Sequence, residues 1–208
     1  MESRKLFAWC AMAAMTTFAA CTGGGGKAEQ QNYDDEDATP GIDVQDKTVY
    51  GICGSGTSMN TLMLITDNND TLELSTAECK EQGRLFGGLS LGDKLAVMTE
   101  KRDGEDVATL VINMSTMLGK WVEPSPLDGN TMTGIELREG GIAVSINQDL
   151  RVYKSWRIFN GRLVLLSYGD DTIDGGLEEV DTFDIQNLGS DSLVVFNGED
   201  GFIFSRQQ

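Results

Sequence analysis

Residues 152–165 read VYKSWRIFNGRLVL, and this stretch decides the fold. Two runs rich in β-branched and aromatic residues flank Asn160-Gly161. This dipeptide is a strong signal for a two-residue β-hairpin, because both residues tolerate the positive φ that such a turn needs. We therefore predict strands over 152–159 and 162–168, joined by a tight turn.

The same pattern of short apolar runs and turn residues extends on both sides of this hairpin. Asp128-Gly129, Gly140-Gly141, Gly189-Ser190 and Asn197-Gly198 separate runs of four to eight residues. The further strands that we predict cover 120–123, 132–138, 142–146, 178–185, 192–197 and 201–205. Eight short strands with tight turns predict an antiparallel meander barrel over residues 116–208.

Residues 47–115 form a second, earlier β-region. We predict strands at 48–53, 60–66, 71–74, 93–99 and 106–113, with a short helix after the third strand. Ser75 or Thr76 would cap this helix, with Glu78 reaching back in a capping box. Three strands, a helix and two strands resemble a small OB-like five-stranded barrel. The expected fold class is therefore all-β, with two barrels in succession.

The C-terminal region contains Gly119-Lys120-Trp121, then the hairpin 152–165, then the blocks 180–185 and 191–195. In this order they resemble the lipocalin-like domains of bacterial envelope proteins. The resemblance implies a closed barrel that binds a small molecule. It also implies that Trp121 plugs the closed end, with Arg206 packed across it.

Alternation along the strands selects the side chains that would face the barrel interior. They are large and apolar, and they share one face of their strands: Val144, Ile146, Trp156, Ile158, Phe183 and Ile185. They either line a ligand cavity or fill the barrel as a solid core. The interior of an eight-stranded barrel is just wide enough to be filled by side chains or to hold one small ligand.

The N-terminus carries a targeting signal. Arg4 and Lys5 precede an uncharged run over 6–20, which is shorter than the roughly 20 residues of a membrane-spanning helix and is typical of a signal peptide. Small residues then precede Cys21, as in bacterial lipoprotein precursors. That resemblance implies cleavage after residue 20 and a lipid anchor on Cys21. An inner-membrane retention signal has aspartate at the position of Thr22. The resemblance therefore also implies that the protein is anchored in the outer membrane, where it faces the periplasm or the cell surface.

Residues 21–46 are predicted to be a lipidated, acidic tether. From residue 22 onward they hold four consecutive glycines, one lysine and seven acidic residues. Such a composition cannot bury a core and favours a flexible chain.

Composition narrows the function. The formal charge of −17 excludes a general binder of nucleic-acid phosphates, which needs a basic surface. The absence of histidine excludes catalytic sites that depend on imidazole and metal sites that need it. Residues 170–181 have a spacing of acidic residues similar to that of an EF-hand calcium loop, but they lack its bidentate glutamate. We therefore expect no metal and no cofactor.

Two cysteines remain in the folded part. Cys53 and Cys79 would lie in an oxidising compartment, where a disulfide between them would add about 3–4 kcal/mol. The alternative is two buried thiols that behave as small apolar side chains.

We therefore expect a non-enzymatic lipoprotein, anchored in the membrane, that binds or carries a small apolar or amphipathic ligand. The alternative is a module that binds an envelope protein partner through solid barrels.

Overall fold

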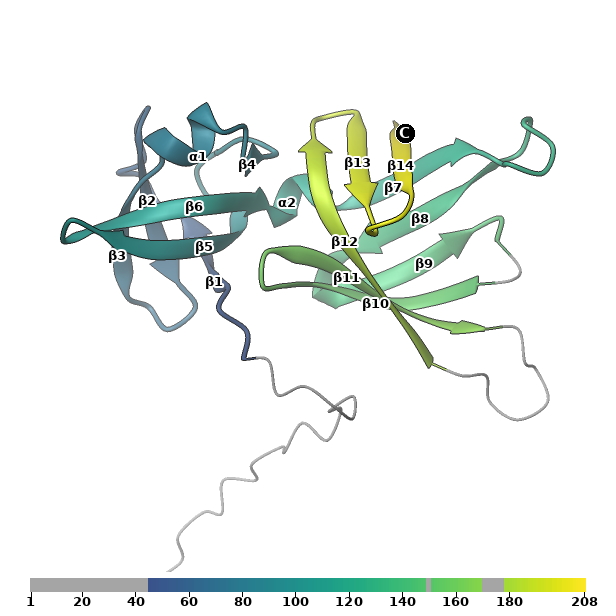
Figure 1. The fold of residues 1–208 in the computed structure, drawn as a ribbon, viewed down its shortest axis with the longest axis horizontal. Coiled ribbons are helices and arrows are strands. Elements are labelled where there is room, and N and C mark those ends of the chain that lie inside the picture. The colour runs from purple at the N-terminus through teal and green to yellow at the C-terminus, as the bar shows by residue number, and fades with distance from the viewer. Residues whose placement is uncertain (1–44, 149–150, 170–177) are drawn as a thin grey trace, which may run out of the picture. The chain divides into compact units, whose positions relative to one another are not determined.

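The computed structural model describes residues 45–148, 151–169 and 178–208. Within these ranges the regular structure is mostly β-strand, as predicted, with the strands in two groups, β1 to β6 and β7 to β14 (Figure 1). The predicted signal peptide, Cys21 and most of the tether lie outside the described residues, as do residues 170–177 of the calcium-like loop. Within the described ranges, no helix has the length and hydropathy needed to cross a membrane.

The first group is the predicted OB-like barrel. Its elements are β1 (Val49–Cys53), β2 (Thr61–Thr66), β3 (Thr71–Ser75), α1 (Ala77–Glu81), β4 (Leu85–Phe86), β5 (Lys94–Arg102) and β6 (Glu105–Asn113). The strands follow one another in the order β3-β2-β1-β5-β6, and a parallel pairing of Ser75 with Val107 joins β3 to β6. This pairing closes the five-stranded barrel. The two-residue strand β4, which the sequence pattern did not indicate, pairs in parallel with β6 on the edge that does not face β5.

The helix of this barrel begins where it was predicted, but its capping box does not form. Thr76 is the N-cap residue, and its hydroxyl makes no side-chain capping bond. Glu78 pairs with Arg102 instead of reaching back to the helix start. The Glu78 carboxylate, which the sequence pattern assigned to the helix cap, is therefore used in an ion pair with Arg102 of β5.

The two cysteines of this barrel are buried and unbridged. Cys53 and Cys79 are free thiols that are at most 1% exposed. The Cys79 thiol donates to the carbonyl of Thr76 over 3.2 Å, and burial raises the pKa of Cys79. Of the two alternatives, the structure thus has the pair of buried thiols.

The second group is a closed eight-stranded meander, as predicted. After α2 (Met114–Met117) come β7 (Gly119–Pro124), β8 (Met132–Arg138), a 3-10 turn (Glu139–Gly141), β9 (Ile142–Ile146), β10 (Arg151–Phe159), β11 (Arg162–Gly169), β12 (Glu178–Leu188), β13 (Ser192–Phe196) and β14 (Gly201–Gln207). Each strand pairs with the next, and β14 pairs with β7, where Arg206 lies opposite Trp121. Closure leaves this barrel without an edge strand.

The Asn160-Gly161 turn has the predicted geometry. Both residues have positive φ, 48° and 71°, as a type I′ turn requires. A Cβ atom on Gly161 would lie 2.5 Å from a methyl carbon of Leu110. The tip of the β10–β11 hairpin therefore packs directly against β6.

The predicted inward face of β9 is wrong. Ile142 is 50% exposed and Val144 and Ile146 are only partly buried, whereas Ala143 is 2% exposed and belongs to the core. On the inward face, Ser145 donates to the Arg151 carbonyl and accepts from the Tyr153 N–H, at 2.7 and 2.8 Å. Ser145 holds β9 to β10 where the backbone ladder has a single pairing, Ser155 with Ile142.

One apolar cluster spans both β-groups. It joins Leu110 and Ile112 of β6 with Ile158 of β10 and other interior residues of the second barrel. The Tyr50 hydroxyl also hydrogen-bonds to the Ile158 carbonyl and to Asp46. Residues 44–208 accordingly form one compact unit.

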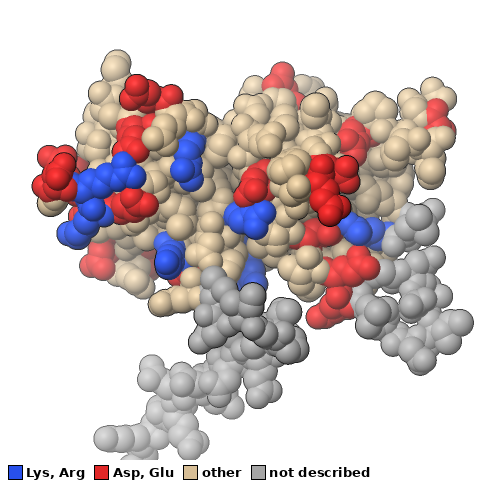
Figure 2. Space-filling view, viewed as in Figure 1, with Lys and Arg blue, Asp and Glu red and all other residues tan. Residues whose placement is uncertain are grey.

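Charged side chains are mixed over the visible surface. On the face shown in Figure 2, lysine and arginine side chains lie among aspartate and glutamate side chains. Several are paired, such as Arg162 with Asp184 at 2.7 Å and Arg138 with Glu136 at 2.6 Å. Pairs as exposed as these contribute little to stability.

Candidate functional site

One end of the second barrel is plugged by Trp121 and Arg206. Trp121 is fully buried, and its indole N–H donates to the carbonyl of Met117 over 2.7 Å. The guanidinium of Arg206 stacks over the indole ring, 4.1 Å from its centroid. It also donates to the carbonyls of Leu118 and Thr116, each at 2.6 Å. We call this the closed end of the barrel.

The plug has two further signatures. Partial burial lowers the pKa of Arg206, because desolvation disfavours the charged guanidinium. A Cβ atom on Gly119 would lie 2.6 Å from a guanidinium nitrogen, and its φ is 126°. Glycine at this position is therefore part of the closure.

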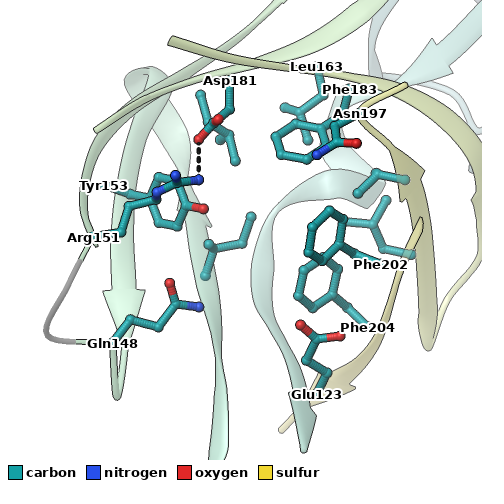
Figure 3. Close-up of a pocket in the computed structure, with 14 residues that line it drawn as sticks. Glu123, Gln148, Arg151, Tyr153, Leu163, Asp181, Phe183, Asn197, Phe202 and Phe204 are labelled. Carbon is teal, nitrogen blue, oxygen red and sulfur yellow. Dashed lines mark hydrogen bonds and ion pairs between the residues drawn. The ribbon is translucent and has the colours of Figure 1, made fainter. Parts of the chain in front are cut away.

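A cavity of about 220 Å³ lies toward the opposite end, which we call the open end (Figure 3). Its walls are mostly apolar side chains from the inward faces of six strands: Ile135, Tyr153, Leu163, Leu165, Phe183, Leu193, Val195, Phe202 and Phe204. Three of the rings form a cluster. Phe202 stacks on Phe204 at 6.3 Å, and Phe183 meets Phe202 edge to face at 5.8 Å.

Polar groups surround the apolar part of the cavity. Arg151 pairs with Asp181 at 2.8 Å and with Glu179 at 3.2 Å, so its charge is balanced from β12. Burial raises the pKa values of both Asp181 and Tyr153. The side-chain oxygen of Asn197 is occupied by the backbone N–H groups of its own turn.

Glu123 is the exception among the charged groups. It lies two residues after Trp121 on β7 and lines the same cavity as Phe204 (Figure 3). Among the described residues it has no hydrogen-bond or ion-pair partner, and burial raises the pKa of Glu123. A partly buried carboxylate without a partner costs free energy in the empty protein.

Ser167 is a second unsatisfied group near the cavity. It shares the inward face of β11 with Leu163 and Leu165 and pairs with Tyr153 across the ladder. It is fully buried, and within the described part of the chain its hydroxyl has no hydrogen-bond partner. Nothing in the apolar packing around it explains a hydroxyl at this position.

The residues predicted to line a cavity are only partly brought together. Phe183 does line it, and Ile185 is buried in the core. Trp156 and Ile158 are buried in the core, which is the other role predicted for them, and they also border a separate pocket of about 430 Å³ near the closed end. Val144 and Ile146 face away, for the reason given for β9.

Sequence reasoning missed the polar lining of the cavity. Glu123 shares the alternating face of Trp121, and Asp181 that of Phe183, so alternation could have placed both inside. Arg151 could not be found in this way, because the bulge between Tyr153 and Ser155 interrupts the alternation of β10. No group of three or more metal-binding side chains is found in the described ranges.

Comparison with known proteins adds the family. The chain is similar to a lipocalin-like protein from Bacteroides thetaiotaomicron of known crystal structure, with 36% identity over 44% of this chain and 97% of that one, at a TM-score of 0.40. None of the curated proteins compared with the chain matches it.

The family model of lipocalin-like domains matches residues 113–207, which span α2 and the whole closed barrel. The plugged closed end and the meander of eight strands agree with this match. Through this C-terminal barrel, the chain belongs to the lipocalin-like family.

Proposed function

We propose that this protein is a non-enzymatic binding protein whose lipocalin-like barrel holds one small amphipathic molecule. The observation that carries the proposal is the cavity, which has apolar walls, polar groups around them and a plug at the other end of the barrel. Small-molecule sites typically combine apolar walls with a few placed polar groups. The pocket of about 430 Å³ near the closed end is lined in part by Tyr50 and Lys94 of the first β-group, so the cavity is the site that the lipocalin-like barrel forms alone.

The size of the cavity limits the ligand. At about 220 Å³ it is smaller than the 300–1,000 Å³ that is usual for drug-sized ligands. It suits a compact molecule with one ring or a short branched chain better than a complete long acyl chain. Transport of whole lipids is therefore the less favoured version of the carrier hypothesis.

Filling the cavity tests the proposal. Val195 lies on the inward face of β13 and lines the cavity, whereas its neighbour Val194 lies on the other face of the same strand. Val195→Phe should remove the binding of small aromatic probes, as followed by two-dimensional NMR titration. Val194→Phe is the matched control and should leave binding unchanged. Equal binding by both variants would refute the cavity as the site.

Anchoring in the envelope is the second part of the proposal. It is supported by the uncharged run before Cys21 and by the acidic, glycine-rich segment after it. A lipid on Cys21 would tether the binding domain to the outer membrane. Cys21→Ser should move the protein from the membrane fraction to the soluble fraction of the producing cell. Retention of the variant in the membrane fraction would contradict the anchor.

A protein-interaction module is the alternative, and exposed apolar side chains on the outer wall favour it. Val152 and Val180 are 41% and 52% exposed, and they lie beside Tyr168 and Leu166 in the β10–β11–β12 ladder. Under this alternative, Val152→Lys with Val180→Lys would abolish a protein complex recovered from cells after cross-linking, and Val195→Phe would not.

A further inference from the structure

The charge balance of the cavity points to the kind of ligand that it takes. Three charged side chains line it, and two of them, Arg151 and Asp181, pair with each other. Glu123 remains without a partner among the described residues. The cavity therefore presents one uncompensated negative charge, and a ligand of the same sign would meet repulsion there.

The surroundings of Glu123 strengthen this bias. Glu123 and Phe204 both line the cavity, and each is the next residue beyond the Val122–Ser205 pair of the β7–β14 ladder (Figure 3). Phe204 stacks on Phe202 with the two planes 8° apart. Aromatic faces carry negative electrostatic potential and attract cations, most strongly where water is excluded. A carboxylate next to such faces is the chemistry that holds an ammonium group.

The available hydrogen-bonding groups agree with a donor on the ligand. The carboxylate of Glu123 can only accept hydrogen bonds when ionised, and the guanidinium of Arg151 is occupied by two carboxylates. An ammonium group supplies three donors and one positive charge. A carboxylate or phosphate on the ligand would instead compete with Asp181 and Glu179 for Arg151, whose charge they already balance.

We propose that the ligand carries an ammonium group, which pairs with Glu123 and packs against Phe204, while its apolar body fills the cavity. The inference rests on the proposed small-molecule function and specifies its ligand class. The ammonium group could belong to a free amine or to an ethanolamine headgroup, and the small cavity favours the free amine.

A matched set of three probes tests the charge. 2-Phenylethylamine, 2-phenylethanol and phenylacetate share one ring and a two-carbon chain and are cationic, neutral and anionic at pH 7.5. Their dissociation constants would be measured by NMR titration of the isotope-labelled protein. Because hydrogen bonds to charged groups are the stronger kind, the amine should bind roughly tenfold or more tighter than the alcohol, and the acid weakest.

Two variants assign the effect to its residue. Glu123→Gln should bring the amine down to the affinity of the alcohol and leave the alcohol unchanged, because shape and volume are kept. Glu136→Gln is the matched control on the outer face of β8, where the carboxylate pairs with Arg138, and it should keep the preference for the amine.

The outcomes separate the two proposals. Equal binding of amine and alcohol by the wild-type protein would overturn the ammonium inference and leave small-molecule binding intact. No binding of any probe would overturn both. Displacement of the amine by vesicles of phosphatidylethanolamine, but not of phosphatidylglycerol, would assign the ammonium group to a lipid headgroup, and a lack of displacement would assign it to a free amine.

Discussion

Replacing Arg206 should open the closed end of the lipocalin-like barrel at a large cost in stability. Arg206→Ala removes two part-buried hydrogen bonds of 2.6 Å to the carbonyls of Leu118 and Thr116, and the stack on Trp121. It also removes an exposed hydrogen bond to the carbonyl of Ser190, whose contribution we take as small. Hydrogen bonds from a charged group contribute about 1.5 kcal/mol each at the low end. A partly desolvated cation–π stack adds about 1 kcal/mol. The free energy of unfolding should therefore fall by about 4 kcal/mol.

Urea unfolding, followed by the fluorescence of Trp121 and Trp156, would measure this loss. With a typical slope of about 2 kcal/mol per molar urea, the midpoint should fall by about 2 M. Arg206→Lys keeps the charge but not the planar fork, so it should lose about half as much.

The control is Arg162→Ala, which removes an exposed ion pair with Asp184 on the same barrel and should cost under about 1 kcal/mol. If Arg206→Ala costs no more than this control, the reasoning on closure is wrong.

Three further predictions concern single residues of the same barrel. Gly161→Ala should destabilise the protein by about 1 kcal/mol more than Gly140→Ala in urea unfolding. Both glycines have positive φ, but only a Cβ at position 161 would collide with Leu110. Equal losses would show that the contact of the hairpin tip with Leu110 does not limit this position. Ser167→Ala should raise the free energy of unfolding by about 1 kcal/mol, since it removes a buried hydroxyl without a partner, and a loss would show that the hydroxyl has a partner in solution. Burial raises the pKa of Glu123 in the folded state, so its contribution to stability is fully present at low pH and is lost as pH rises through that raised value. Glu123→Gln should therefore stabilise the empty protein at pH 7, by less than about 1 kcal/mol, and leave it unchanged at pH 3.5; thermal melts at both pH values would show this, and a loss at pH 7 would contradict it.

The hairpin and the meander were predictable because they depend on local chemistry. Asn160-Gly161 satisfies the backbone of a tight turn without help from the rest of the chain. The order of elements, three strands, a helix and two strands, likewise indicated the OB-like barrel. In that barrel β3 and β6 pair in parallel, and the connection between them contains α1. These elements follow from neighbours in sequence.

The face of β9 was not predictable from its own residues. Ile142, Val144 and Ile146 are the larger apolar side chains, and alternation favours burying them. The structure places Ala143 and Ser145 on the inward face instead, because the Ser145 hydroxyl supplies hydrogen bonds that the sparse β9–β10 ladder lacks. A register decided by the partner strand leaves no signal in the strand itself.

The cavity was harder still to predict, because its polar residues come from distant strands. Arg151 meets Asp181 across thirty positions of sequence. Their pairing is set by the register of β10, β11 and β12, which includes a bulge. Glu123 and Asp181 did carry a usable signal, through their spacing from Trp121 on β7 and from Phe183 on β12.

The apolar cluster that Leu110 and Ile112 share with Ile158 makes the two barrels depend on each other for their stability. Neither barrel can open fully without exposing surface that the other covers, so the slowest amide protons of both should exchange through one common unfolding event. A molecule bound in the lipocalin-like barrel would shift that unfolding equilibrium toward the folded state. Hydrogen exchange in β6 would then slow down, although no atom of β6 touches the molecule.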